Sequence, residues 1–541
     1  IATISNGRLD RRRAVGKLVE LSDLLVHKPL AGRAGIGHTR WATHGAATQT
    51  NAHPHKAGPV AVVHNGIIEN YRALRDEISE AGLSWHSETD TETIALICQK
   101  YMAEGLSPTD AAQATVNRLE GAFALAFLFD GEPDLIFAAR RGSPLAIGYG
   151  EGEMYLGSDA IALGQLTDRI TYLEDGDSAV IHRAGAEIFD ASGAPVSRAV
   201  KSVQADQTRI DKGGYRHFMA KEIAEQPAVI RVTLDAYLDE SGTRIALPKQ
   251  LDLAGTQRVT MVACGTAYYA CLTAKYWIES LAGIPVDVDI ASEFRYREPP
   301  LPDGTLTLFV SQSGETADTL AALRYCESQA MRIVSLTNVA ESSIARASDV
   351  ALPIHAGPEI GVASTKAFTC QLAALAVLAL HAGQQTGRLD AAAVSEHLGH
   401  LVALPGLIIQ ALGMSDRIAQ ISTELAEAQD ILYLGRGAMF PMALEAALKM
   451  KEICYIHAEG YASGELKHGP IALVDRTVTV IVFAPHDRLF GKTLSDMEEV
   501  IARQGQVVLV NAAQAASGLS HRRGARDRCR PASQAGKVCH C

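Results

Sequence analysis

The sequence predicts an α+β sandwich followed by two α/β units with parallel sheets. Three observations predict this fold class: short strands lie at close spacing from Ile1 to about Ser202, apolar strands alternate with helices after Val259, and the alternating pattern occurs twice. A chain of 541 residues is also too long for one hydrophobic core, because domains average about 150 residues. We therefore expect several domains.

The composition excludes several classes of protein. Apolar residues make up 47% and charged residues 21% of the chain, as in ordinary globular proteins. The net charge of -11 gives no field that would recruit nucleic acid or an anionic membrane, so we expect neither as a partner. The longest apolar run, Leu372 to Leu380, is far shorter than the ~20 residues that cross a bilayer and predicts a buried helix. The first six cysteines form no CxxC pair, which favours reduced thiols and a cytoplasmic location.

The first region begins with a predicted hairpin. The alternating strand IATIS turns at Asn6-Gly7, a dipeptide typical of type I′ turns, into RLDRRRAV. Helical patterns over 71–82, 90–105 and 109–120 interrupt the strands that follow. The predicted strands are VAVVHNG, FALAFLF, DLIFAA, PLAIGYG, MYLGSD and DSAVIHR. This mixture of strands and helices indicates an α+β sandwich.

Both ends of the chain differ from the patterns beside them. Ile1 lies inside a predicted strand, so we expect that residues have been lost ahead of it. After the strand pattern QVVLVN at 506–511, the sequence becomes SHRRGARDRCRPASQAGKVCHC, which has no apolar periodicity and contains three cysteines. A disordered basic tail and an out-of-frame terminus both explain this segment.

The second region is predicted to be duplicated. Residues 203–250 are more polar and predict a linker with one helix, around KEIAEQPAVIRVTLDAYL. Beyond it, VTMVACGTA, LTLFVSQSGE and RIVSLTN are matched by DILYLGRGA, VTVIVFAPH and QVVLVN. Cys264 and Ser311 lie 47 positions apart, and Gly435 and Ala484 lie 49 apart. This register predicts two copies of one α/β unit with right-handed crossovers; coincidental spacing of unrelated units is the alternative.

Polar side chains follow a strand of the first copy, at the point where a helix begins. The strand TLTLFV is followed by Ser311, Gln312, Ser313 and Thr316. Helix N-terminal amides attract anions at this edge of an α/β sheet, and Gly314 allows a ligand to approach the backbone, so the loop predicts a phosphate site. Helix capping is the alternative, although it needs only one hydroxyl.

Two further segments favour the same site. Thr266 lies in the turn CGT after another strand, which alone is a weak signal. The segment EIGVASTKAFT, residues 359–369, carries Ser364 just before an alanine-rich helix and is placed to close over a sugar. An ordinary capped helix start is the alternative for this segment.

An acid–base cluster is predicted in the second copy. Glu445, Lys449 and Glu452 share one helical face because they lie four and three positions apart. Moving a proton between two carbons of a hexose needs a carboxylate base, for which Glu452 is the candidate. Ring opening needs another acid–base group, for which His468 in the following Gly-rich loop is the candidate. A salt bridge and a core histidine explain the same residues without a reaction.

The motifs HTRWATHG, HNGIIEN and SETDTE of the first region suit a free amino acid whose amide is hydrolysed. Arg40 can bind a carboxylate and Asp90 an ammonium group. Asn65 and the Gly66 amide can form an oxyanion hole. Each motif alone also fits a turn or packing. No nucleophilic thiol is evident, because Cys98 lies in the helical pattern ALICQKYM and is expected to be a core residue.

Five histidines accompany these motifs: His38, His44, His53, His55 and His64. They suggest a metal site, but no cysteine or carboxylate stands at ligand spacing beside them. We therefore expect histidines that form hydrogen bonds, and no metal.

Taken together, the motifs resemble the isomerising glutamine:fructose-6-phosphate amidotransferases. The resemblance rests on HTRWATHG, NAHPH, VVHNGIIEN, SETDTE, CGT, ASEFRYR, SQSGETADT, EIGVASTKAF and YIHAEGYASGELKHGP, in this order from near Ile1 to about Asn511. It implies an α+β N-terminal-nucleophile (Ntn) sandwich followed by two α/β SIS (sugar isomerase) domains with parallel sheets. The implied domains are an incomplete glutaminase (class II glutamine amidotransferase) domain at 1–202, a linker at 203–250, SIS domain 1 at 251–390, and SIS domain 2, incomplete with an aberrant tail, at 420–541.

The resemblance also implies an activity and its residues. The substrates would be glutamine and fructose 6-phosphate, with ammonia channelled between the domains, glucosamine 6-phosphate and glutamate as products, and no cofactor. The glutamine site corresponds to Arg40, Thr43, His44, Asn65, Gly66 and Asp90, with Trp41 as the channel gate. The sugar-phosphate site corresponds to Thr266, Ser311, Gln312, Ser313, Thr316, Val362 and Ser364, although Ala267 replaces a serine found in many relatives.

The catalytic groups of the family also have counterparts here. Glu452 corresponds to the isomerising base, Lys449 to a proton-transfer partner and His468 to the ring-opening group. In the family that last group comes from the other subunit, which implies a homodimer.

Two departures from the family bear on activity. The family's catalytic cysteine opens a CGI start that is not present, and its final segment with a Schiff-base lysine is replaced by SHRRGARDRCRP and its continuation. We therefore expect this polypeptide to release no glutamate from glutamine and to isomerise poorly. An ammonia-dependent sugar-phosphate isomerase or deaminase would need only the duplicated half, and the motifs before residue 93 argue against it. A sugar-phosphate-sensing SIS protein would not need Glu452, Lys449 and His468 together.

Overall fold

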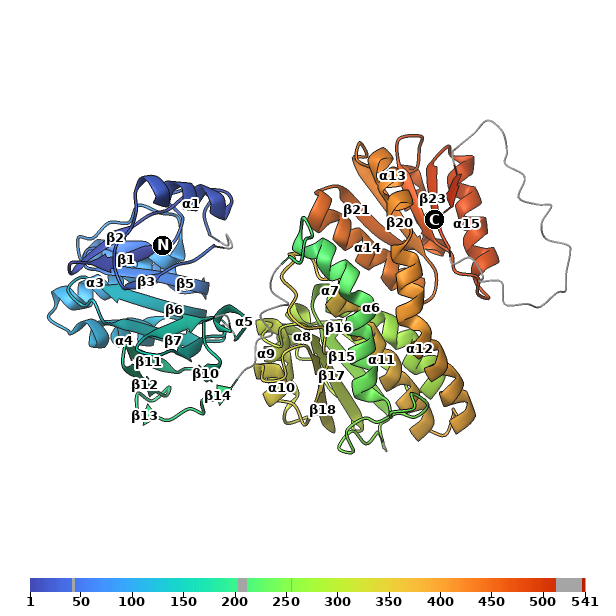
Figure 1. The fold of residues 1–541 in the computed structure, drawn as a ribbon, viewed down its shortest axis with the longest axis horizontal. Coiled ribbons are helices and arrows are strands. Elements are labelled where there is room, and N and C mark those ends of the chain that lie inside the picture. The colour runs from blue at the N-terminus through green and yellow to red at the C-terminus, as the bar shows by residue number, and fades with distance from the viewer. Residues whose placement is uncertain are drawn as a thin grey trace, which may run out of the picture. The chain divides into compact units, whose positions relative to one another are not determined.

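The computed structural model describes residues 1–40, 44–158, 160–164, 166–202, 212–253, 255–511 and 538–540. The chain forms two compact units, Ile1–Thr208 and Arg209–Cys541 (Figure 1). The predicted site residues Trp41 and Thr43 lie outside the described residues, as does the tail at 512–537 and 541.

The first unit begins with the predicted hairpin. Strand β1 (Ala2–Ser5) pairs antiparallel with β2 (Arg8–Arg11). Asn6 and Gly7 have positive φ angles of 50° and 74°, as a type I′ turn requires. The hairpin prediction is confirmed.

Three sheets form the first unit. Their further strands are β3 Ala34–Ile36, β4 His55–Ala57, β5 Val60–Ile68, β6 Gly121–Phe129, β7 Ile136–Arg141, β8 Ala146–Tyr149, β9 Met154–Gly157, β10 Arg169–Tyr172, β11 Ser178–His182, β12 Gly185–Phe189, β13 Pro195–Val196 and β14 Lys201–Ser202. The sheet orders are β2-β1-β3, β14-β10-β8-β9 and β13-β12-β11-β7-β6-β5-β4. The sequence prediction misses β3, β4, β10 and β12 to β14, because strands of two to five residues show too few alternations.

The three helices predicted in this unit are confirmed. They are α2 Tyr71–Glu80, α3 Asp90–Ala103 and α4 Pro108–Arg118, joined by the unpredicted α1 Leu18–His27 and α5 Ala160–Leu163. Strand β6 is buried on both faces. Phe123 and Phe127 pack with Ile97 of α3, whereas Ala126 packs with Ile4 of β1 on the other side. Because side chains alternate along a strand, this arrangement is the predicted α+β sandwich.

The second unit contains two five-stranded sheets. The strands of the first are β15 Arg258–Ala263, β16 Val286–Ile290, β17 Thr305–Ser311, β18 Arg332–Thr337 and β19 Val350–Pro353, and those of the second are β20 Asp430–Gly435, β21 His457–Ala462, β22 Thr479–Phe483, β23 Gln506–Val510 and β24 Val538–His540. The orders are β16-β15-β17-β18-β19 and β21-β20-β22-β23-β24. All neighbouring strands are parallel. The shared order confirms the duplication.

Helices surround both parallel sheets (Figure 1). They are α6 Phe218–Tyr237, α7 Gly265–Ala282, α8 Ala291–Arg297, α9 Ala317–Cys326, α10 Ser343–Arg346, α11 Lys366–Gln385, α12 Ala391–Leu412, α13 Ser415–Leu425, α14 Met439–Cys454 and α15 Phe490–Ala502, with 3-10 segments Ser463–His468 and Pro470–Leu473. The helix expected inside the linker is α6. Its Ile230 and Tyr237 are buried in one core with Met261 of β15 and Leu375 of α11, so α6 packs as part of the second unit.

Two of the described helices, α11 and α12, are long and apolar enough to span a membrane by length and composition. In α11, 72% of the apolar window is buried, which confirms the predicted buried helix. In α12 only 11% is buried, and Leu407 and Ile409 are 52% and 60% exposed. Helix α12 therefore presents an apolar surface.

Candidate functional site

A cavity of about 250 Å³ in the first unit brings together the described part of the predicted amino-acid site. Residues from three segments line it: Arg40 and His44 precede β4, Asn65 and Gly66 belong to β5, and Asp90 begins α3. These segments lie up to 50 positions apart in the sequence, and the antiparallel sheet and the start of α3 place them together.

Gly66 is required at its position in β5. Its φ is 137°, and a Cβ atom there would lie 2.0 Å from the carbonyl oxygen of Ala122 on β6. Two positions later the amide of Ile68 donates to Asp90 Oδ2 at 2.8 Å. The buried Asp90 carboxylate is thereby fixed at the wall of the cavity.

Arg40 braces a turn beside the cavity. Its Nη2 donates to the carbonyl oxygens of His44 and Gly45 at 2.6 and 2.8 Å, and its Nη1 donates to that of Ala46 at 3.0 Å. A guanidinium group has five N–H donors. The contacts leave donors for a ligand, but they show that Arg40 also holds the turn in place.

Threonine hydroxyls bond three of the five histidines. His53 Nε2 and His64 Nδ1 lie 3.0 and 3.1 Å from Thr91 Oγ1, and His55 Nε2 lies 3.0 Å from Thr89 Oγ1. Burial lowers the pKa of His55 and of His64 to about 4 and also lowers the pKa of His53. These rings are therefore neutral at pH 7. In the described part of the chain, no three His, Cys, Asp or Glu side chains are placed to hold a metal ion.

No cysteine is among the described residues that line this cavity. Cys98 is fully buried in α3, as predicted, and burial raises the pKa of its thiol to about 12. Burial likewise raises the pKa of Cys326 and of Cys370 to about 12. Of the cysteines before residue 512, only Cys454 is exposed.

A second cavity, of about 200 Å³, contains the predicted phosphate loop. It lies at the carboxyl ends of β15 and β17 in the first parallel sheet. Six predicted residues line it: Thr266, Ser311, Gln312, Ser313, Thr316 and Ser364. The other lining residues are Cys264, Ala267, Val310 and Gln371.

The hydroxyls of the loop bond one another and the loop backbone. Ser311 Oγ lies 2.9 Å from Thr316 Oγ1 and accepts from the Gly314 amide at 3.0 Å. Ser313 Oγ accepts from the Glu315 amide at 3.1 Å. Thr316 occupies the N-cap position of α9, yet its side chain makes no capping hydrogen bond. Helix capping therefore does not explain why a residue with a hydroxyl group occupies position 316.

Gln371 also lines the cavity and is not among the residues predicted from the sequence. It is 2% exposed, and its Oε1 has no hydrogen-bond partner among the described residues. An unsatisfied buried amide oxygen costs about 1–3 kcal/mol. The signal in the sequence is a lone amide within the apolar pattern of α11, a pattern that by itself predicts only a buried helix.

Four residues predicted for the sugar site are not among the described residues that line this cavity: Val362, Lys449, Glu452 and His468. Val362 is 90% exposed, His468 is exposed at the end of its 3-10 segment, and Glu452 lies on α14 of the second copy. Thr266 connects the cavity to α14. Its Oγ1 accepts from Lys449 Nζ at 2.9 Å and donates to Glu445 Oε1 at 3.1 Å.

The acid–base cluster on α14 is present as one ion-paired group. Lys449 Nζ lies 2.7 Å from Glu452 Oε2 and 3.3 Å from Glu445 Oε1. Glu445 is 5% exposed, and burial raises its pKa to about 7, with Lys449 opposing the shift. Burial also raises the pKa of Tyr269 on α7, with the charges of Glu445 and Glu452 adding to it. Sequence spacing identified the pairing but not the proton affinity of Glu445, which depends on burial.

Comparisons with known proteins match both units. The glutamine amidotransferase domain family matches residues 38–165, and the SIS domain family matches residues 252–381 and 424–518. The chain is 54% identical over 521 residues to the glutamine–fructose-6-phosphate aminotransferase (isomerizing) of Brucella suis. The matched residues cover 96% of this chain and 86% of that protein. The chain is also 55% identical over 518 residues to the protein of that name from Bradyrhizobium diazoefficiens, covering 95% and 85%.

A solved structure resembles the second part of the chain. The C-terminal domain of glucosamine-fructose-6-phosphate aminotransferase from Francisella tularensis is 45% identical, with a TM-score of 0.55, and covers 56% of this chain and 85% of that chain.

Proposed function

Since this chain belongs to the isomerizing glutamine–fructose-6-phosphate aminotransferases, we propose that its first cavity binds glutamine and its second binds fructose 6-phosphate. The reaction of the family moves the amide nitrogen of glutamine to the sugar and yields glucosamine 6-phosphate and glutamate. The amidotransferase match at 38–165 supports the glutamine-dependent reaction over an ammonia-dependent isomerase, which would need only the SIS match. Phosphorylated substrates and buried reduced thiols support a cytoplasmic location.

One observation carries the sugar assignment: hydroxyl and amide side chains converge on the second cavity at the start of α9. Ser311, Ser313 and Thr316 surround the phosphate. None of the described lining residues is Lys or Arg, so the helix dipole and neutral hydrogen-bond donors balance the anion. Thr266, Gln312, Val362 and Ser364 contact the rest of the sugar.

The residues on α14 supply the proton chemistry. Glu452 removes a proton from one sugar carbon and returns it to the neighbouring carbon. Lys449, whose ammonium group lies between the carboxylates of Glu445 and Glu452, takes part in that transfer. His468 opens the sugar ring. In the first cavity Arg40 and Asp90 bind the amino acid, with Thr43 and His44 beside them.

The remaining roles concern ammonia and its release. Asn65 and the Gly66 amide stabilise the oxyanion formed when the amide is hydrolysed. Trp41 gates the passage of ammonia to the sugar.

Crystals soaked with fructose 6-phosphate test the sugar assignment. We expect phosphate density between Ser311, Ser313 and Thr316, with the sugar carbons on the side of Thr266. The matched soak with fructose leaves the hydroxyl loop empty. Sugar-phosphate density at another cavity, with these hydroxyls free, would disprove the assignment.

The glutamine cavity is tested by glutamate release. No cysteine is among its described lining residues, and amide hydrolysis by this family needs a thiolate nucleophile. The 541-residue polypeptide is therefore proposed to bind glutamine but to release no glutamate. An enzyme-coupled glutamate assay, with heat-denatured protein as blank, measures the rate, and turnover above the blank contradicts the proposal.

A homodimer completes the sugar site. His468 is needed for ring opening, yet it is exposed and does not line the cavity of its own chain. The apolar surface of α12 supports a second copy as its cover.

Light scattering tests this assembly. Wild type is expected as a dimer, and Leu407→Glu with Ile409→Glu is expected as a monomer, while the exposed control Gln410→Glu stays dimeric. A monomeric wild type, or one that binds lipid vesicles through α12, would contradict it.

A further inference from the structure

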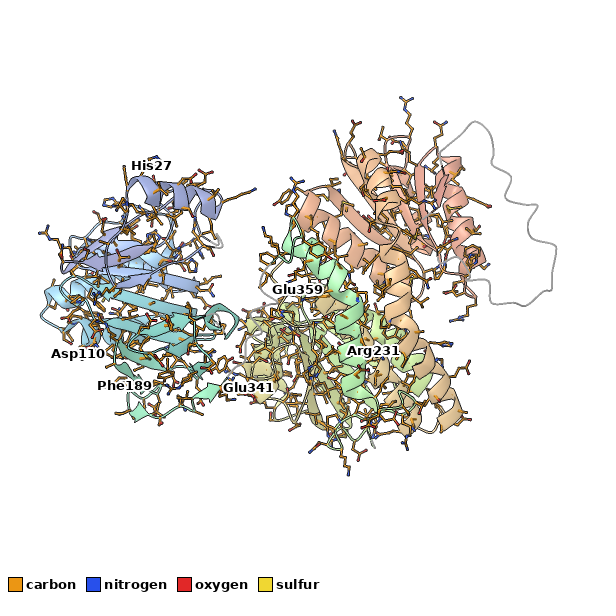
Figure 2. The ribbon with its side chains drawn as sticks, in the orientation of Figure 1. His27, Asp110, Phe189, Arg231, Glu341 and Glu359 are labelled. Atoms are coloured by element: carbon orange, nitrogen blue, oxygen red, sulfur yellow. The ribbon has the colours of Figure 1, made fainter. Side chains whose placement is uncertain are left out.

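The loop that carries Ser364 is held by side chains that lie far from it in the sequence. We call residues 356–365 the sugar-side loop. At its start, Asn338 Oδ1 accepts from the Ala356 amide at 2.8 Å and Asn338 Nδ2 donates to the Gly357 carbonyl at 2.7 Å. Two carboxylates, Glu222 and Glu359, hold the remainder. Glu359 lies in the second unit (Figure 2).

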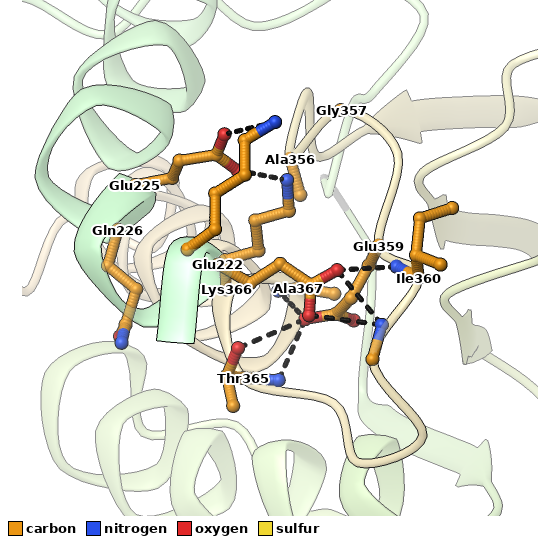
Figure 3. Close-up of polar contacts among 12 residues, drawn as sticks. Glu222, Glu225, Gln226, Ala356, Gly357, Glu359, Ile360, Thr365, Lys366 and Ala367 are labelled. Atoms are coloured by element: carbon orange, nitrogen blue, oxygen red, sulfur yellow. Dashed lines mark hydrogen bonds and ion pairs between the residues drawn. The ribbon is translucent and has the colours of Figure 1, made fainter. Parts of the chain in front are cut away.

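Glu222 attaches the sugar-side loop to α6. It is 2% exposed, and its Oε1 accepts from the amides of Ile360 and Gly361 at 2.5 and 2.9 Å. Figure 3 shows Glu222 of α6 bonded to the segment with Ile360, whereas Glu225 of the same helix pairs with Lys366. A Cβ atom on Gly361 would lie 2.4 Å from Glu222 Oε2. The contact therefore requires glycine at 361.

The two oxygens of Glu359 have separate partners. Oε1 accepts from the amides of Thr365 and Ala367, at 2.7 and 3.3 Å, and so caps the start of α11. Oε2 accepts the hydroxyl proton of Ser364 at 2.9 Å. Capping the helix accounts for Oε1 alone and gives no reason for the bond to Ser364.

The hydrogen bond to Glu359 determines whether Ser364 can donate or accept a hydrogen bond when a ligand is bound. A serine hydroxyl has one proton to donate and two lone pairs that accept. Because Glu359 takes the proton, Ser364 can only accept a hydrogen bond from a ligand in the cavity. A phosphate dianion, with a second pKa of about 6, has no proton to give at pH 8, whereas every sugar hydroxyl has one.

We propose that Glu359 is a positioning residue of the sugar-phosphate site, which fixes Ser364 as the acceptor for a sugar hydroxyl, while Glu222 holds the loop in reach of the ligand. This inference rests on the proposed function. The phosphate is recognised by Ser311, Ser313 and Thr316. The sugar hydroxyls are recognised by Ser364, which Glu359 positions.

The Glu359→Gln variant isolates this role. Its amide oxygen can keep the cap on α11, while its NH₂ group faces Ser364 and donates where the carboxylate accepted. The helix is also anchored independently, since buried Lys366 pairs with Glu225 of α6 at 2.7 Å. The variant is therefore expected to fold while the polarity of Ser364 is reversed.

Calorimetry at pH 8 with two probes measures the effect in the full chain. For Glu359→Gln we expect the Kd of fructose 6-phosphate to rise about 10-fold, the size of one lost hydrogen bond, and the Kd of inorganic phosphate to change less than about twofold. The control Glu327→Gln, an exposed carboxylate after α9, changes neither Kd. Equal losses for both probes, or no loss for either, would overturn the proposal.

Further variants keep the test decisive. Ser364→Ala is expected to show the same selective loss, and Glu359→Gln added to it should cost nothing more, because one interaction is lost only once. If Glu359→Gln does not fold, Ser364→Ala and Glu222→Gln carry the same comparison of probes. A wild-type chain that binds phosphate but not fructose 6-phosphate refutes the proposed function instead.

Discussion

The two parallel sheets of the second unit have one topology and different chemistry. At the end of β17 the first copy has Ser311, Gln312 and Ser313, while at the end of β22 the second copy has Ala484 and Pro485. The first loop lines a cavity with hydroxyls, and the second has no hydroxyl at the matching positions. Topology therefore fixes where a ligand can bind, and the side chains at the strand ends decide which copy binds it.

The second copy contributes a helix instead of a phosphate loop. Its α14 carries Glu445, Lys449 and Glu452, and Thr266 of the first copy bonds the first two directly. We propose that the first copy binds the sugar phosphate and that the second copy transfers its protons.

The largest effect is expected from the second copy. Glu452→Gln removes the proposed base, and general base catalysis contributes about 10²- to 10⁴-fold in rate. We expect solvent-deuterium exchange into fructose 6-phosphate, followed by NMR, to fall by that factor from the wild-type rate while the Kd of the sugar stays within about twofold. Glu498→Gln, an exposed carboxylate of α15, is the matched control. If Glu452→Gln exchanges deuterium at the wild-type rate, Glu452 is not the catalytic base.

The next effect separates the two loops. Ser311→Ala with Thr316→Val removes two hydroxyls, each worth about 0.5–1.5 kcal/mol, so the Kd of fructose 6-phosphate should rise about 10- to 100-fold. His486→Ala, in the corresponding exposed loop of the second copy, should leave it within about twofold. Calorimetry on both variants makes the comparison, and equal losses would mean that the copies share the phosphate.

The smallest effect concerns stability at the contact between the copies. Burial raises the pKa of Glu445 from 4.5 to about 7, so the native chain keeps a proton that the unfolded chain loses in that interval. Stability should fall as the pH rises from 4.5 to 7 and level off above it. Glu445→Gln has no such proton and should flatten the slope, a difference of about 1–2 kcal/mol after allowance for solvent.

Urea unfolding at pH 5, 6, 7 and 8 measures that slope. Glu498→Gln should retain the wild-type slope, because its carboxylate is exposed. If the free energy of unfolding of Glu445→Gln falls with pH as steeply as that of wild type, the pKa of Glu445 does not differ between the native and unfolded chains.

Sequence patterns predicted what depends on neighbouring residues. Asn6-Gly7 identified the hairpin, because its turn needs two positive φ angles, and periodicity identified α2, α3 and α4. The spacing of repeated strand patterns predicted the two matching sheets. The polar residues after β17 were predicted together because they lie within six positions.

Features that arise from distant contacts were missed. Lys449 and Thr266 are 183 positions apart, and Gly361 and Glu222 are 139 apart. Neither distance leaves a periodic signal. The pKa of Glu445 is raised because other segments bury it, and they also bury the Gln371 oxygen, which has no partner among the described residues. Only the folded chain reveals both features.

Because most other described cysteines are buried, the exposed Cys454 at the end of α14 can be labelled selectively. Thiol reagents attack the thiolate, and burial suppresses that form at Cys98, Cys326 and Cys370. Cys454, the last residue of α14, is exposed and lies two positions beyond Glu452. With Cys529, Cys539 and Cys541 changed to serine, a maleimide fluorophore should react first at Cys454 and report on sugar binding from beside the proposed base.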